Sequence, residues 1–216
     1  MGTDKPLVSI VMAVYKPNID WLRQQLESLN NQTYTNLELI ICDDCPEFPV
    51  NEKIFSEIIT NFPFKFFRNE KNLGSNKTFE KLTKLASGKY ISYCDQDDIW
   101  DSDKVEKMAE VLENTGSPLV CSDLRIIDGS GNQIADSITK IRKRHIFREG
   151  NGLAPKLLVS NFVTGCAMII RADIAKNAAP FAQTLVLDQW LSINAAMCGK
   201  IEVIHEPLVS YRQHDS

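Results

Sequence analysis

Three carboxylates lie close together in the segment 90–100, which reads YISYCDQDDIW. The apolar, β-prone part of this segment ends at Cys94, and Asp95, Asp97 and Asp98 follow directly. Carboxylates this close disfavour one another's ionisation unless a cation lies between them. Their hard oxygen atoms suit Mg²⁺ or Mn²⁺. The spacing therefore predicts a divalent cation site with a phosphate beyond it.

A purely structural explanation competes with the metal site. Asp98, Asp101 and Asp103 lie near the start of a predicted helix, and acidic side chains at that place stabilise a helix N-terminus. This accounts well for Asp101 and Asp103 and partly for Asp98. It does not account for Asp95 and Asp97, for which we keep the metal interpretation.

The elements that must position this cluster alternate between strand and helix. Apolar runs predict buried strands, and amphipathic runs predict helices. The strands are expected at residues 7–14, 37–42, 64–68 and 90–94, and the helices at about 19–31, 51–61, 75–86 and 102–114. Such alternation indicates a parallel sheet with helices on its faces. Right-handed crossovers then bring the four strand ends to one rim, where α/β sheets bind ligands. The rim collects residues 13–16, 43–44, 69–74 and 95–98.

The pattern changes after residue 116. We expect a strand at 119–122, a hairpin of 124–127 with 132–134, a strand at 161–170 that contains Gly165, a helix from about 185 to 198, and strands at 201–204 and 208–211. A glycine inside a strand often marks the close approach of another backbone or a ligand. Asp188 falls in the first turn of the predicted helix, where capping would also explain an acid.

The stretch 137–149 is basic and poor in apolar residues. We interpret it mainly as a mobile, solvated loop. The alternative is a basic flap that meets an anionic substrate or a membrane surface.

Composition narrows the class of protein. The chain has 216 residues, 44% hydrophobic and 24% charged, which is typical of one soluble globular domain. A net charge of −4 argues against bulk nucleic-acid binding. No run approaches the ~20 apolar residues of a membrane span, and no signal-peptide pattern precedes the first strand. We therefore expect a cytoplasmic protein, and the end at 211–216 without a terminal helix suggests truncation.

Five motifs, each expected near a strand end, together resemble a known family. They are VSIVMAVY at 8–15, DD at 43–44, NLG at 72–74, DQDDIW at 95–100 and YRQH at 211–214. In this order they resemble family 2 glycosyltransferases with the GT-A fold, most closely the rhamnosyltransferase-like enzymes of bacterial surface polysaccharide assembly. The resemblance implies an α/β fold with a Rossmann-like, mostly parallel central sheet flanked by helices and a mixed C-terminal, acceptor-side portion. It implies a single domain, with residues 1–115 as the nucleotide-sugar half and 116–216 as the acceptor half.

The resemblance also implies roles for individual residues. Asp44 would bind the base of the nucleotide, Asp95 the ribose or the metal, and Asp97 the metal directly. Asp188 would be the catalytic base, and His214 would reach the metal or the diphosphate. The other expected nucleotide-sugar contacts are Ala13, Val14, Tyr15, Asn72, Gly74, Lys77 and Gln96, and the expected acceptor contacts are Gly165 and Trp190.

Two positions depart from the family pattern. In the family's Asp-Asp-x-Ser-x-Asp pattern, this chain has Cys45, Pro46 and Glu47 after Asp44, so the family's ribose contacts in that segment are not carried over. Leu187 precedes the catalytic acid, where the family often has a polar residue.

The expected reaction is an inverting, metal-dependent sugar transfer. A divalent cation stabilises the charge that grows on the leaving diphosphate, and a carboxylate takes the proton of the attacking hydroxyl. The resemblance implies dTDP-rhamnose as the first donor and UDP-hexoses next. The acceptor would be a saccharide or a lipid-linked sugar, with peripheral association at the inner face of the membrane.

Other classes of protein fit less well. A phosphotransferase of the haloacid dehalogenase type needs an Asp after the first strand, where this chain has Val14, Tyr15 and Lys16. A dinucleotide-binding domain needs G-x-G-x-x-G at the same place. A non-catalytic nucleotide-sugar sensor or subunit stays open, and Asp188 argues modestly against it.

Overall fold

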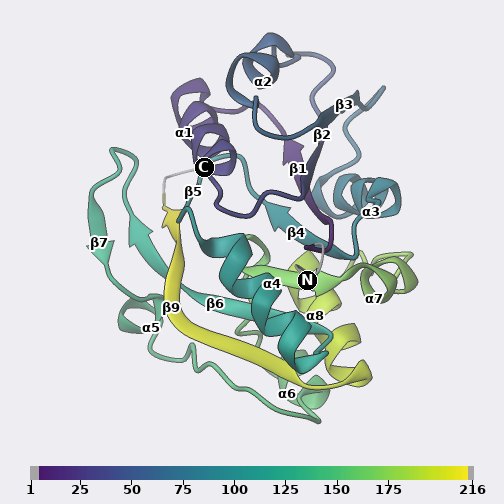
Figure 1. Cartoon of the computed structure of the whole chain (residues 1–216), viewed down its shortest axis with the longest axis vertical. Helices are drawn as coiled ribbons and strands as arrows, with labels where there is room; N and C mark the ends of the chain where they lie inside the picture. The colour runs from purple at the N-terminus through teal and green to yellow at the C-terminus, as the bar shows by residue number, and fades with distance from the viewer. Residues whose placement is uncertain (1–4, 214–216) are drawn as a thin grey trace.

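The computed structural model describes residues 5–213 (Figure 1). The strands are β1 (Val8–Val14), β2 (Leu37–Asp43), β3 (Phe64–Arg68), β4 (Tyr90–Cys94), β5 (Ile99–Trp100), β6 (Leu119–Ile127), β7 (Gln133–Ala135), β8 (Met168–Arg171) and β9 (Ile201–Arg212). The helices are α1 (Ile19–Asn30), α2 (Lys53–Ile58), α3 (Ser75–Leu85), α4 (Lys104–Thr115), α5 (Ile138–Ile141), α6 (Ala154–Val159), α7 (Ala172–Asn177) and α8 (Leu187–Cys198). A 3₁₀ turn, η1, covers Gly165–Ala167.

The strands form one mixed sheet in the order β3-β2-β1-β4-β8-β6-β9-β5, with β7 on β6. The first four strands are parallel, and β1 lies between β2 and β4. The expected parallel sheet of the N-terminal half is therefore confirmed, and the carboxyl ends of its strands share one edge. From β4 onward the sheet is mixed: β8 is antiparallel to β4 and β6, whereas β6 is parallel to β9.

Two strands are longer than expected. The predicted pieces 119–122 and 124–127 are one strand, β6, and the pieces 201–204 and 208–211 are one strand, β9. Register shifts near Asp123 let β6 and β9 pair across the irregularity at Pro207. Figure 1 shows β9 in yellow curving along the edge of the molecule until its end lies beside β5. The last residues of β9 consequently reach the loop that follows β4.

The predicted strand 161–170 is wrong in its first part. Residues 165–167 form η1, and only Met168–Arg171 pair as β8. The helix expected at 51–61 is limited to Lys53–Ile58, and the helices α5, α6 and α7 were not expected. These helices have four to six residues, too few for their periodicity to be distinguished from that of a strand or loop.

The core has two layers, one on each face of the sheet. Successive β-strand residues point to opposite faces, and accordingly Ile10 and Met12 join the cluster under α1, α2 and α4, whereas Val11 joins the cluster that contains Phe79 and Leu82 of α3. Strands buried on both faces read as continuous apolar runs. This is why β1 and β2 were recognisable in the sequence.

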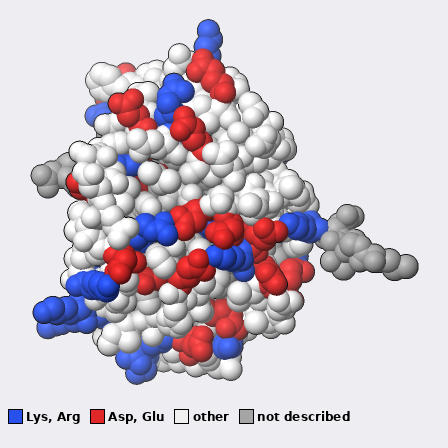
Figure 2. Space-filling model, turned by 60° about the vertical axis from the view of Figure 1, so that its left-hand side comes forward, with Lys and Arg blue, Asp and Glu red and all other residues white. Residues whose placement is uncertain are grey.

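The surface mixes both signs of charge. On the face in Figure 2, Lys and Arg side chains lie beside Asp and Glu side chains in a band across the middle. Ion pairs such as Lys107 with Asp103 and with Glu206 show the same mixing. In residues 5–213 no helix is both long enough and apolar enough to cross a membrane.

Candidate active site

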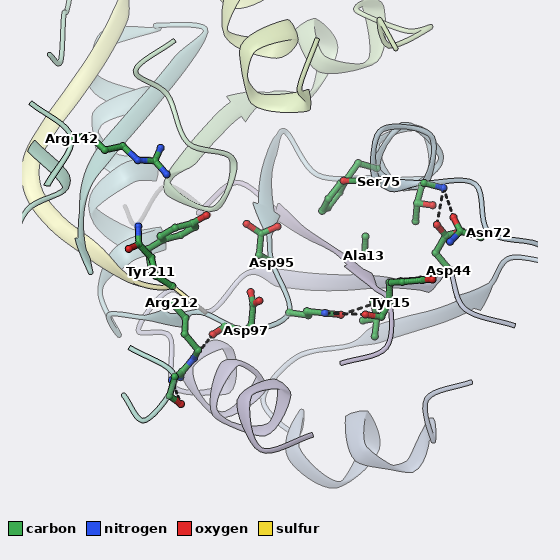
Figure 3. Close-up of a pocket in the computed structure, with 17 residues that line it drawn as sticks. Ala13, Tyr15, Asp44, Asn72, Ser75, Asp95, Asp97, Arg142, Tyr211 and Arg212 are labelled. Atoms are coloured by element: carbon green, nitrogen blue, oxygen red, sulfur yellow. Dashed lines mark hydrogen bonds between the residues drawn. The ribbon is translucent and has the colours of Figure 1, made fainter. Parts of the chain in front are cut away.

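A pocket of about 1070 Å³ lies at the carboxyl edge of the parallel strands (Figure 3). Its walls come from the ends of β1, β2, β4 and β9, from the start of α3, and from the segments that contain Gly129 and Arg142. The lining residues are Ala13, Val14, Tyr15, Asp44, Asn72, Gly74, Ser75, Thr78, Phe79, Asp95, Gln96, Asp97, Gly129, Arg142, Tyr211, Arg212 and Gln213. The structure thus brings together most of the residues expected to hold a nucleotide sugar.

Gln96 and Tyr15 join two strand ends. The Tyr15 backbone N–H donates to Gln96 Oε1 over 2.8 Å, and Gln96 Nε2 donates to the Tyr15 carbonyl oxygen over 3.0 Å. This pair of hydrogen bonds is drawn dashed in Figure 3. It sets the separation between the loop after β1 and the acidic loop after β4. The Gln96 amide therefore fixes the position of the Tyr15 backbone, which forms part of the pocket wall.

Asp44 organises the turn that leads into α3. The carboxylate accepts hydrogen bonds from Asn69 Nδ2 at 2.7 Å, from the Leu73 N–H at 2.8 Å and from the Gly74 N–H at 2.9 Å. Gly74 has φ +81°, a backbone conformation that favours glycine, and a side chain there would be strained. The buried Asp44 carboxylate therefore fixes the start of α3, and with it the positions of Ser75 and Thr78, which line the pocket.

The three acids after β4 occupy different environments. Asp95 and Asp97 line the pocket, whereas Asp98 is fully buried and accepts the Arg212 N–H over 3.0 Å. α4 begins only at Lys104, so Asp98 does not cap that helix as expected. Its role is structural, because it ties the acidic loop to the end of β9.

Burial and mutual repulsion act on the carboxyl groups. Burial raises the pKa of Asp95 to about 7, with further contributions from the charges of Asp97 and Asp188. Burial and the neighbouring Asp95 also raise the pKa of Asp98 well above its ordinary value. A ligand atom from each of Asp95, Asp98 and Cys166 lies within 4.8 Å of the others. A positive charge placed here would relieve that repulsion.

The donor atoms available in the pocket fit a hard divalent cation. Asp95 and Asp97 offer carboxylate oxygens to the pocket, and such oxygens are preferred by Mg²⁺ and Mn²⁺. Burial of Asp95 beside other acids makes its ionised form costly without a counter-charge.

Asp188 of α8 does not line this pocket itself, but its charge acts on Asp95, which does. Its Oδ1 accepts hydrogen bonds from Asn161 Nδ2 at 3.0 Å and from the Gln189 N–H at 2.6 Å. Burial raises the pKa of Asp188, and its charge in turn raises that of Asp95. Gly165 lies beside it, since a Cβ at Gly165 would be 3.9 Å from the Asp188 Cβ. The two acid regions, far apart in the sequence, therefore lie close enough for their charges to interact.

Five expected site residues are not among those that line the pocket, namely Lys77, Gly165, Asp188, Trp190 and His214. Lys77 lines a separate cavity of about 680 Å³ with Phe67 and Phe181. Trp190 directs its indole N–H to the Ala178 carbonyl oxygen at 2.9 Å and packs toward α7. His214 lies outside the described residues.

Several lining residues were missed by the sequence reasoning. Tyr211 and Arg212 belong to the YRQH motif, so the motif itself was the available signal. Arg142 falls in the basic stretch interpreted mainly as a mobile loop, yet α5 ends beside the pocket and Figure 3 shows its side chain extending toward Tyr211 and Asp95. For Ser75 and Thr78 the sequence indicated only that a helix begins there, and no local pattern predicted that they line a pocket.

The fold and the acidic pocket define the class of protein. A parallel sheet carries acids at its carboxyl edge and continues into a mixed, curled half, which is the α/β architecture of GT-A-like glycosyltransferases. Residues 9–177 match the family described as Glycosyl transferase family 2. The chain belongs to this family and is a glycosyltransferase.

Similar proteins support this assignment. An uncharacterised glycosyltransferase of Methanocaldococcus jannaschii is 34% identical over 97% of this chain and 71% of its own length. WfgD of Escherichia coli, described as UDP-Glc:α-D-GlcNAc-diphosphoundecaprenol β-1,3-glucosyltransferase, is 26% identical over 92% of this chain and 76% of its own length. Crystallised S. aureus TarS in complex with UDP-GlcNAc has the same fold, with a TM-score of 0.75 at 16% identity, over 97% of this chain and 59% of that chain. This chain likewise spans 59% of three mycobacterial relatives.

Proposed function

We propose that this chain transfers a sugar from a nucleoside-diphosphate donor to an acceptor hydroxyl with inversion at the anomeric carbon. The observation that carries the proposal is that Asp95 lines the pocket and that Asp188 lies close enough to it for its charge to raise the pKa of Asp95. Direct displacement needs one base on the acceptor side and charge stabilisation on the leaving-group side. Asp188 would supply the base, and the acids of the pocket would hold the stabilising cation.

The donor nucleotide would lie between the ends of β1 and β2 and the start of α3. Asp44 supplies carboxylate oxygens, and the segment 13–15 supplies backbone groups that Gln96 holds in place. Asn72 and Gly74 complete that end of the pocket. We propose a UDP-hexose as the first donor, because WfgD is named for UDP-glucose and TarS was crystallised with UDP-GlcNAc. A dTDP-sugar such as dTDP-rhamnose is the second.

Asp95 and Asp97 would hold Mg²⁺ or Mn²⁺ next to the donor's diphosphate. When bound, the cation stabilises the negative charge that develops on the leaving diphosphate. Arg142 lines the same pocket and adds a permanent positive charge. Tyr211 and Arg212 close the pocket from β9.

Asp188 would take the proton from the acceptor hydroxyl. Asn161 Nδ2 and the Gln189 N–H donate to Oδ1 of this carboxylate, and the Gly165 backbone also hydrogen-bonds the carboxylate. Burial raises its pKa, and a base with a raised pKa accepts a proton more readily near neutral pH. The neighbouring Gly165 leaves room beside the base. The acceptor itself would be a saccharide or a lipid-linked sugar.

A matrix of donors and cations tests this function. The thermal unfolding temperature of the chain is measured with UDP-glucose, UDP-GlcNAc, dTDP-rhamnose and GDP-mannose, each with Mn²⁺, with Mg²⁺ and with EDTA. A ligand that binds the folded state raises that temperature, so at least one donor should raise it more with a cation than with EDTA. Release of the nucleoside diphosphate is then measured for each donor that binds. Binding without turnover under all acceptors tried would instead favour the non-catalytic sensor, and no binding at all would refute the proposal.

A further inference from the structure

Large apolar side chains are exposed around the acceptor side of the site. Val159 is 86% exposed, Val186 62%, Leu158 59% and Ile146 56%. Single exposed apolar residues are ordinary, but a group of them marks an interaction site. These four come from the end of α6, the residue before α8 and the loop between α5 and α6.

Specific contacts hold these segments together. Gln189 Nε2 donates to the carbonyl oxygens of Leu157 at 2.9 Å and Leu158 at 3.1 Å, which fastens the end of α6 to the first turn of α8. Phe147 packs edge-on against Phe162, with ring centroids 6.5 Å apart. The loop that carries Ile146 is thereby held next to the segment that leads from α6 to Gly165. In Figure 1, α5, α6 and the loop between them lie at the lower end of the molecule, away from α1 and α2.

Basic residues flank Ile146 along the chain. The stretch 137–149 contains five Lys or Arg and one acid, in a chain whose net charge is −4. Lys140 is paired with Asp136, whereas Lys143, Arg144 and Arg148 are exposed and form no ion pair within the described part of the chain. Exposed cations next to exposed apolar side chains fit the interface of an anionic bilayer, which offers negative headgroups above an apolar interior.

We propose that this face, defined by Ile146, Leu158, Val159 and Val186 with Lys143 and Arg144, docks on an anionic lipid bilayer. Apolar side chains enter the headgroup region while the basic side chains contact lipid phosphates. The face borders the catalytic region, because Val186 directly precedes the turn that carries Asp188 and Arg142 lines the pocket. Docking here presents the acceptor side of the site to the membrane. This docking surface rests on the proposed function, because it concerns the acceptor of that reaction. It favours a lipid-linked sugar over a free saccharide as the acceptor.

Vesicle co-sedimentation tests the docking surface directly. Binding of the chain is measured with phosphatidylcholine vesicles and with vesicles that contain 30% phosphatidylglycerol. We expect binding to the anionic vesicles, weakened by added salt because screening reduces the attraction. L158S/V159S and K143E/R144E should each lower the partition coefficient by about tenfold or more.

Matched substitutions outside this set of residues serve as controls. Ile134→Ser removes an apolar side chain of β7 that is 55% exposed, and R23E/K53E reverses two exposed charges on α1 and α2. Neither control should change vesicle binding. Absence of binding to anionic vesicles, equal binding to neutral vesicles, or equal losses in the controls would overturn the docking surface.

Donor chemistry separates this inference from the proposed function. Release of nucleoside diphosphate with water or with a tail-free sugar acceptor, in the absence of vesicles, should be unchanged in L158S/V159S and K143E/R144E. Failure of vesicle binding with intact donor turnover overturns only the docking surface. Intact vesicle binding without any donor binding overturns only the proposed function.

Discussion

Arg212 Nε donates a hydrogen bond to the carbonyl oxygen of Asp97 over 2.8 Å, and this bond joins the end of β9 to the acidic loop after β4. The Arg212 N–H also donates to Asp98 Oδ1, and its guanidinium reaches the Asp128 carbonyl oxygen and Gln24 Oε1. The side chain is only 4% exposed. Arg212 thus fixes the position of the acidic loop that carries Asp97 relative to α1 and to the C-terminal half of the chain.

Replacement of this arginine should loosen the site and the fold together. Arg212→Met leaves several buried carbonyl and amide oxygens without a donor, so we expect the free energy of unfolding to fall by about 2–4 kcal/mol. Urea unfolding measures it. Arg23→Met, at an exposed position of α1, is the control and should change stability by less than about 0.5 kcal/mol. Equal stability of the two variants would contradict the anchoring role.

Gln96→Glu tests the link to Tyr15. The carboxylate can still accept from the Tyr15 N–H, but it repels the Tyr15 carbonyl oxygen that Gln96 Nε2 now contacts. It also adds a negative charge beside Asp95 and Asp97. We expect about tenfold weaker donor binding by calorimetry, corresponding to about 1.4 kcal/mol. Gln183→Glu, which alters a contact with Phe181 outside this pocket, should leave donor affinity unchanged.

Asp188→Asn should abolish most of the transfer while donor binding persists. General base catalysis typically contributes 10²–10⁴-fold, so a loss of about that size in turnover is expected with unchanged donor affinity. Asp173→Asn, an exposed acid paired with Arg171, is the matched control. Transfer at the unaltered rate in Asp188→Asn would place the base elsewhere.

The pH profile of transfer should reflect the environment of Asp188. Because burial raises its pKa, the carboxyl group gains a proton at a higher pH than an exposed aspartate does. Turnover should therefore fall as the pH is lowered through this raised pKa, and the fall should begin above the range of an exposed Asp. Rates measured from pH 5 to 9 at saturating donor reveal the inflection. A profile that is flat down to pH 5 would contradict it.

Asp97→Asn should remove the cation's contribution to donor binding. In the unaltered chain we expect Mn²⁺ to increase the shift in unfolding temperature that a nucleotide sugar produces. In Asp97→Asn that increase should be lost, while the shift measured with EDTA stays. Asp103→Asn, which removes a surface partner of Lys107, should retain the full effect of Mn²⁺. A full Mn²⁺ effect in Asp97→Asn would show that the cation is held by other groups.

Lys104 should give the stability of the chain a specific pH dependence. The side chain is fully buried, with its ammonium 3.1 Å from the centroid of the Trp100 ring, and burial lowers its pKa to about 7. Between pH 7 and about 10 the unfolded chain keeps the proton that the folded chain has lost, so this group makes stability rise with pH. The difference in unfolding free energy between the unaltered chain and Lys104→Met should rise by up to about 1.4 kcal/mol per pH unit in this window. A constant difference would show that Lys104 is charged in the folded state throughout.

Local patterns in the sequence were sufficient for the N-terminal half of the site. Continuous apolar runs identified β1, β2 and β4, because strands buried on both faces have no polar side. The acids and glycine that follow these runs were then expected at one edge, since parallel strands end together. Asp44, Gly74, Asp95 and Asp97 all line the pocket as this reasoning requires. The family motifs added Asp188, which no spacing rule would have related to them.

The tertiary structure alone decided what each of these residues contacts. Asp98 hydrogen-bonds the end of β9 and does not cap the following helix. Arg142 lines the pocket, whereas Lys77 lines a separate cavity, and Asn161 donates to Asp188. These relationships join residues 27 to 114 positions apart. These contacts depend on how β6 and β9 bend and pair. They also depend on which side chains fit between the packed elements. A local pattern records the period and end of an element, whereas the partner of a buried polar group is set only when distant elements pack.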